Sequence, residues 1–232
     1  MVPLDGDDST AVAITVATFA FAILFMIAAL TYGMQIAQSV VTEKESRIVE
    51  ILAAAVPIRS LLVGKVVGNT LMALSQVVLL VTVSLVGLQF TAYQAMIGIV
   101  APVAGWFILF FLVGFASLAC LWAAAGSMAT RVQDLGQTTT PLMMVVMLVY
   151  MTGLFARGTV AEVLSYLPIA STVIMPGRLL SGEATWLNAL LALLVAAAFM
   201  ALAIWFGAKV YRRGLLQTGS VLSYKQIFSK TH

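Results

Sequence analysis

The chain has 232 residues, of which 62% are hydrophobic and only 9% are charged, and its mean hydropathy is +1.08. A soluble domain of this size carries about a quarter charged residues, so the composition excludes an ordinary soluble enzyme and indicates an integral membrane protein. The formal net charge of +3 is then expected to come from loop residues that set orientation, and no nucleic-acid partner is predicted. The single cysteine, Cys120, cannot form a disulfide within the chain, and the single histidine is the last residue, His232, so no metal site is expected.

Long apolar runs predict five membrane-spanning helices. A helix needs roughly 20 apolar residues to cross the hydrocarbon core, and lipid excludes backbone that is not hydrogen-bonded. The N-terminus is acidic, unlike the basic start of a signal peptide, so the first run is read as a true span. The predicted fold is therefore an all-α polytopic membrane helical bundle in one transmembrane domain, with spans at about 11–37, 61–88, 102–128, 138–156 and 186–209.

Basic residues are distributed unevenly between the two sides of this predicted bundle. Successive connections between the five spans lie on alternate sides of the membrane. Arg157 and Arg178 then lie on the same side as the N-terminus, and the remaining Lys and Arg residues lie on the other side. Positively charged loops stay in the cytoplasm, so we expect a multi-pass protein of the cell membrane with its N-terminus outside. Its C-terminal tail, 210–232, is then cytoplasmic. The residues assigned to the cytoplasmic side are Lys44, Arg47, Arg59, Lys65, Arg131, Lys209, Arg212, Arg213, Lys225 and Lys230.

The connection at 157–185 is apolar but is broken by Pro168, Pro176, Gly177 and Gly182. Its apolar pieces are too short to span, which predicts an outer re-entrant or interfacial pair of half-helices. Arg178, with Glu162 and Glu183, could gate or line an exit from this segment. The alternative, which we favour, is that these groups lie in headgroups or water and fix the depth of the segment.

A charged segment, EKESRIVEILAAAVPIRSLLVGK, joins the first two spans and contains seven of the 21 charged residues. On a helix at 43–56, Glu43, Arg47 and Glu50 share one face, and Pro57 ends the helix. Such an amphipathic helix is expected to lie in the cytoplasmic interface. It would either anchor the two spans or form a docking surface for a soluble partner.

No acidic or basic residue lies in the middle of a predicted span, which counts against a proton or ion relay. Four amides, Gln35, Gln38, Asn69 and Gln76, could face a transport pathway. Hydrogen bonding between helices is the more ordinary role of such side chains.

Four sequence motifs add a resemblance to a known family. The stretch SVVTEKESRIVEILAAAVPIRSLLVGK resembles the signature of bacterial ABC exporter permeases of the type-two class, the sodium- and drug-exporter kind. Three later stretches agree in order: AAAGSMATRVQDLGQTTTPLMM, YLPIASTVIMPGRLLSGEATW and KVYRRGLLQTGSVLSYKQIF. The residues that match the first signature are Glu43, Lys44, Arg47, Glu50, Ile51, Leu52, Leu61, Leu62, Gly64 and Lys65.

This resemblance implies a permease subunit that works with a separate ATPase subunit and pairs with itself or another permease chain. ATP and magnesium would be bound by the ATPase, and this chain would bind no cofactor, since no G-x-x-x-x-G-K-[ST] loop is present. The coupling residues would be Glu43, Lys44, Glu45, Arg47, Glu50 and Arg59.

Permeases of this kind commonly begin with a further span and an extracellular domain, for which this sequence shows no counterpart. A non-transporting assembly or regulatory subunit, or one piece of a split permease, is therefore kept as the alternative. An intramembrane enzyme is not supported, because the spans lack His and Asp and the sequence lacks H-E-x-x-H and G-x-S-x-G motifs. Sodium, a peptide, a drug or a lipid-like molecule would each be compatible with an apolar pathway.

Overall fold

The computed structural model of the chain describes residues 5–46, 56–91 and 93–215, with side chains from residue 11 onward. Of these described residues, 89% are helical and none lies in a strand. The predicted all-α helical bundle is thereby confirmed. The elements are α1 (Asp5–Glu45), α3 (Ile58–Leu88), η1 (Gln94–Met96), α4 (Ile97–Met128), η2 (Val132–Asp134), α5 (Leu135–Phe155), α6 (Gly158–Leu164), α7 (Ala170–Leu180) and α8 (Trp186–Leu215).

Five helical segments are long and apolar enough to cross a membrane: Ala11–Glu45, Ile58–Leu88, Gln94–Met128, Val132–Phe155 and Trp186–Leu215. They correspond to the five predicted spans, but most are longer. Helix α1 runs through Glu45 and α8 through Leu215, beyond the ends of their apolar runs. Pro102 and Pro141 lie inside α4 and α5. Membrane helices tolerate such prolines because neighbouring groups and local adjustments satisfy the freed carbonyls.

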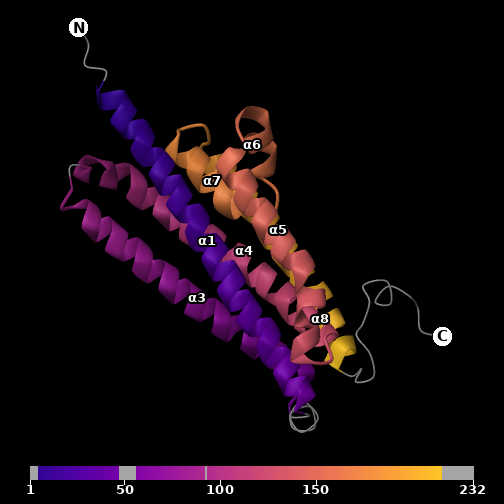
Figure 1. Cartoon of the computed structure of the whole chain (residues 1–232). Helices are drawn as coiled ribbons and strands as arrows, with labels where there is room; N and C mark the ends of the chain where they lie inside the picture. Colours follow the sequence, from indigo (N-terminus) through magenta and orange to yellow (C-terminus); the bar gives the residue numbers. More distant parts are fainter. Residues whose placement is uncertain (1–4, 47–55, 92, 216–232) are drawn as a thin grey trace.

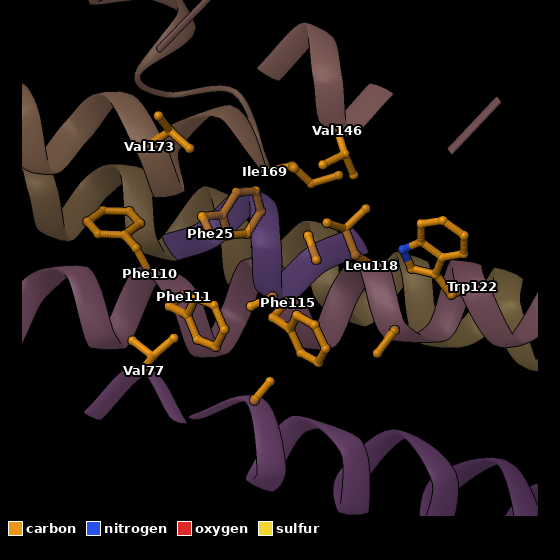
Figure 2. Packing of buried hydrophobic residues seen from close by; sticks show 14 of the residues in the cluster. Phe25, Val77, Phe110, Phe111, Phe115, Leu118, Trp122, Val146, Ile169 and Val173 are labelled. Atoms are coloured by element: carbon orange, nitrogen blue, oxygen red, sulfur yellow. The ribbon is translucent and has the colours of Figure 1, made fainter. Parts of the chain in front are cut away.

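Helix α4 is the centre of the bundle, in contact with α1, α3, α5, α7 and α8. Its aromatic side chains fill the core between these helices, and Phe107, Phe110, Phe111, Phe115 and Trp122 are all fully buried. Figure 2 shows several of them with the side chains that pack around them. The rings of Phe111 and Phe115 stack with centroids 5.5 Å apart. Offset stacking of this kind adds to the stability gained from burial.

Two close helix contacts depend on glycine. The position of a Cβ on Gly126 of α4 would lie 2.7 Å from the Cα of Ala37 on α1, and one on Gly207 of α8 would lie 2.9 Å from the carbonyl oxygen of Cys120 on α4. A larger residue would force the backbones apart. Small residues allow this near approach, which is how membrane helices gain van der Waals contact without a hydrophobic driving force.

The segment predicted to be re-entrant is folded as two short helices, α6 and α7. Ile169, which precedes α7, has a φ of 69°, a strained value for a β-branched residue. Helix α7 is almost entirely buried against α1, α4, α5 and α8. Figure 1 shows α6 and α7 at the end of the bundle where α1 begins, opposite the end where α1 finishes and α3 starts.

Candidate functional site

The candidate site is the end of the bundle where α1 and α8 end, α3 begins and α4 turns into α5 (Figure 1). Chain direction brings most of the described basic residues here: Lys44, Arg59, Lys65, Arg131, Lys209, Arg212 and Arg213. Arg157 and Arg178 belong to the opposite end, which carries α6 and α7. This is the separation predicted from the sequence. We call the end with the seven basic residues the basic end.

At the basic end, α1 is joined to α3 by an ion pair. The ammonium of Lys65 donates to the carboxylate of Glu43 and to the hydroxyl of Ser39, one turn earlier on α1. The side chain of Lys65 is 14% exposed and that of Glu43 is 27% exposed. Because water is largely displaced around both groups, their attraction is stronger than that of an exposed surface pair.

The next residue of α1, Lys44, is buried and joins α1 to α4. Its ammonium donates to the carbonyl oxygens of Ser127 at 2.8 Å and Ala129 at 3.0 Å. The last carbonyls of a helix have no partner within the helix, and a lysine there also interacts favourably with the helix dipole. Lys44 therefore caps the C-terminus of α4 from a neighbouring helix.

Glu45, the last residue of α1, contacts the turn that follows α4. Its carboxylate accepts a hydrogen bond from the backbone N–H of Val132, the first residue of η2, at 3.2 Å. Asp134 closes the same turn by accepting from the Thr130 hydroxyl at 2.6 Å and from the Arg131 backbone N–H at 3.1 Å. Three consecutive residues, 43 to 45, thus fasten the end of α1 to α3, α4 and η2.

Comparison with known proteins decides what kind of membrane protein this is. A family model described as an ABC-2 family transporter protein matches residues 3–209. The chain belongs to the ABC-2 transporter family. It is also 25% identical over 221 residues to a Bacillus subtilis (strain 168) protein named "Uncharacterized protein YhaP". That alignment covers 89% of this chain but 52% of the relative, so the chain spans about half the relative's length. No solved structure matches.

Family membership and the five long apolar helices identify the chain as a multi-pass membrane protein of the ABC-2 transporter family. The predicted resemblance is confirmed. Within the residues that the structure describes, no group of three His, Cys, Asp or Glu side chains could hold a metal ion.

The six residues predicted to couple this ABC-2 permease to its partner occupy three kinds of position. Glu43 and Lys44 face other helices, whereas Glu45 and Arg59 are exposed at the basic end, on either side of the segment 47–55. Arg47 and Glu50 lie outside the described residues. Within the described residues, Glu43 forms an ion pair with Lys65 on α3. Residues 43–45 also continue α1 instead of beginning a separate helix.

Two of the amides predicted to face a pathway line a shallow groove. Gln35 and Gln38 are exposed on α1 and border an open groove of about 420 Å³ together with Ser39, Thr42 and Glu43. The groove ends at the ion pair between α1 and α3. Polar side chains on α1 thus continue from the spanning region to the basic end.

The other two amides, both on α3, make hydrogen bonds within the bundle. Asn69 donates to the carbonyl of Lys65 at 2.9 Å, and Gln76 accepts from the hydroxyl of Tyr32 on α1 at 2.7 Å. The Gln76 contact is an interhelical bond of the kind considered from the sequence. Tyr32, Ser39 and Lys65 had not been singled out as functional partners, because their contacts link residues 22 to 44 positions apart.

Arg178, on α7, is buried at the end opposite the basic end. Its guanidinium donates to the Ser165 hydroxyl at 2.8 Å and to the Glu183 carbonyl at 3.3 Å. It also lies 3.8 Å from the Glu183 carboxylate. Arg178 therefore connects α7 to the end of α6 and to the loop that leads into α8.

Proposed function

We propose that this chain is the membrane-spanning subunit of an ATP-driven exporter, and that a separate ATPase subunit binds at the basic end. ATP and magnesium are held by the ATPase, and this chain performs no chemistry. The N-terminus lies outside the cell and the basic end lies in the cytoplasm. A second copy of the chain, or another permease chain, completes the pathway.

The observation that supports this proposal best is the triple attachment at the end of α1. Glu43 contacts α3, Lys44 caps α4 and Glu45 contacts η2. A force applied to the segment after α1 reaches all three elements through charge-assisted hydrogen bonds, which are stronger than neutral ones. Packed helices of this kind shift between discrete arrangements instead of deforming continuously.

The exposed residues Glu45 and Arg59 bracket the segment that contains Arg47 and Glu50. We assign the docking surface to these four residues. Glu43, Lys44 and Lys65 then transmit the motion of that surface. Glu43 and Lys44 are directed from α1 at α3 and α4, and Lys65 is directed from α3 at α1. Glu45 belongs to both groups, because its carboxylate also accepts a hydrogen bond from Val132, whereas Arg59 belongs to the docking surface alone.

The pathway in this proposal follows α1. Gln35 and Gln38 border the groove that leads to Glu43, and their amides can exchange hydrogen bonds with a passing solute. Asn69 and Gln76 support α3 beside it. Arg178 belongs to the opposite, outer end of the bundle.

The test is co-expression of the chain with the ATPase encoded nearest to it, followed by co-purification and measurement of ATP hydrolysis in lipid vesicles. Glu45→Ala/Arg59→Ala is expected to reduce ATPase association by about tenfold, equivalent to about 1.4 kcal/mol. Arg157→Ala, at the opposite end, is the matched control and should bind normally. If the double variant binds the ATPase as well as the unaltered chain, the docking assignment is wrong. Co-purification with another membrane chain but with no ATPase would favour the assembly or split-permease alternative.

A further inference from the structure

A polar pocket opens at the end of the bundle opposite the basic end. It lies between α1, α5, α6 and α7 and has a volume of about 200 Å³. The lining residues that matter here are Thr15, Phe19, Arg157, Arg178, Ser181 and Glu183. Neither the ATPase docking surface nor the groove beside Gln35 and Gln38 includes any of them.

The pocket carries a net positive charge. Among its described lining residues, Arg157 and Arg178 are positive and Glu183 is negative, which leaves one positive charge in excess. The side chain of Glu183 is 58% exposed, so water screens its charge, whereas the side chain of Arg178 is 10% exposed. The buried positive charge is therefore the less screened of the two.

Arg178 has hydrogen-bonding capacity to spare. A guanidinium has five N–H donors, and the bonds to Ser165 and Glu183 engage its two terminal nitrogens. Its Nε is buried and has no hydrogen-bond partner in the described part of the chain. The Glu183 carboxylate, 3.8 Å away, is beyond hydrogen-bond distance. A buried donor left unsatisfied is costly, and a phosphate oxygen matches the geometry of a guanidinium edge.

An apolar stripe leads away from the mouth of this pocket. Phe19 lines the pocket, and Ile23 and Ile27 follow it at four-residue intervals on α1. Residues four apart share one face of a helix, and all three side chains are exposed, at 38%, 38% and 47%. An anion-binding pocket that continues into an apolar stripe suits a molecule with a charged head and a hydrocarbon tail.

We propose that this pocket binds the phosphate group of an anionic membrane phospholipid, whose acyl chain lies along Phe19, Ile23 and Ile27. Arg178 provides the buried donors and Arg157, exposed just after the end of α5, provides a second charge at the level of the headgroups. The site does not depend on the proposed transport function. It would hold α6 and α7 against α1 and α5 through a lipid that the protein selects.

The test uses the full chain purified in detergent, with bound lipid measured by native mass spectrometry. The probes are phosphatidylglycerol, phosphatidylcholine and a diacylglycerol with the same acyl chains. We expect retention in the order phosphatidylglycerol, phosphatidylcholine, diacylglycerol. Arg157→Gln and Arg178→Lys should each weaken phosphatidylglycerol binding by about tenfold, the loss expected for one charge-assisted hydrogen bond. Arg212→Gln, which removes an exposed charge at the basic end, should leave binding unchanged.

Several outcomes would overturn the proposal. One is equal retention of phosphatidylglycerol by Arg157→Gln and by the unaltered chain. Because Arg157 is exposed, its replacement should not prevent folding, so this variant tests the proposal even if Arg178→Lys fails to fold. Equal loss in Arg212→Gln would show that charge attracts lipid without a site. The lipid assignment would also be overturned if millimolar inorganic phosphate displaced phosphatidylglycerol and the chain retained phosphatidylglycerol no better than diacylglycerol. That result would identify a site for a free anion.

Discussion

The ammonium of Lys65 on α3 lies against the carboxylate of Glu43 on α1, and both groups are more than two-thirds shielded from solvent. The chain between them contains the segment 47–55, to which we assign part of the ATPase docking surface. The ion pair therefore joins the two helices that flank the segment on which the ATPase would act. Together with the Tyr32–Gln76 hydrogen bond, it links α1 to α3.

The pair makes a clear prediction for a double-mutant cycle. Glu43→Gln and Lys65→Gln should each reduce thermal stability in detergent, while the double variant should lose less than the sum of the two. Residues in direct contact show coupling of roughly 0.5–3 kcal/mol, and this partly exposed pair should fall near the lower end. Simple additivity of the two losses would mean that the pair contributes nothing.

Lys44 should be a stronger determinant of stability than exposed cations nearby. Lys44→Met would leave the carbonyls of Ser127 and Ala129 without their donor, at a cost of about 1–3 kcal/mol. Arg212→Met, which alters an exposed residue in the last turn of α8, is the control and should change stability little. The readout is the thermal unfolding midpoint of each purified variant, and equal midpoints would contradict the capping role.

Replacing glycine with alanine should reduce thermal stability where helices are in close contact and should not reduce it where a helix faces open space. Gly126→Ala forces a methyl group against the backbone of Ala37 and should cost about 1–3 kcal/mol, as overpacking generally does. Gly68→Ala is the matched change, because within the described residues a Cβ there meets no atom within 4 Å. Alanine is favoured over glycine in a helix by roughly 0.5–1 kcal/mol, so Gly68→Ala should be neutral or slightly stabilising. The comparison is made by thermal unfolding, and a reversed order would show that α1 and α4 are not in close contact.

Membrane orientation can be tested with single cysteines, since the native Cys120 is buried. In intact cells, a membrane-impermeant maleimide should label Arg157→Cys but should label Arg212→Cys only after the membrane is opened. The expectation rests on the excess of basic residues at one end. The reverse labelling pattern would invert the proposed topology.

Hydropathy was sufficient to predict the five spans and the interrupted segment that became α6 and α7, because both depend on local composition. The ends of α1 and α8 were predicted too early, since the apolar runs stop before the helices do. Lys44 and Glu43 remain helical because distant groups on α4 and α3 satisfy their charges. No periodicity within one segment could reveal those partners.

The candidate site shows the same limit. Composition and charge were sufficient to predict a possible docking surface in the charged segment, and Glu45 and Arg59 are exposed at its two ends. The inward direction of Glu43 and Lys44 could not be read from helical spacing, because it depends on where α3 and α4 lie. The unsatisfied nitrogen of Arg178 likewise became apparent only once Ser165 and Glu183 were placed around it.

The most direct measurement is photo-cross-linking of the basic end to the partner ATPase. A photoactivatable maleimide is attached to Arg59→Cys, and separately to Arg157→Cys as the control, in a complex with the co-expressed ATPase. We predict a covalent adduct with the ATPase from position 59 and none from position 157, with the yield from position 59 changing when ATP is added. Cross-linking from position 157 in place of position 59, or from neither position in a complex that hydrolyses ATP, would contradict coupling through the basic end.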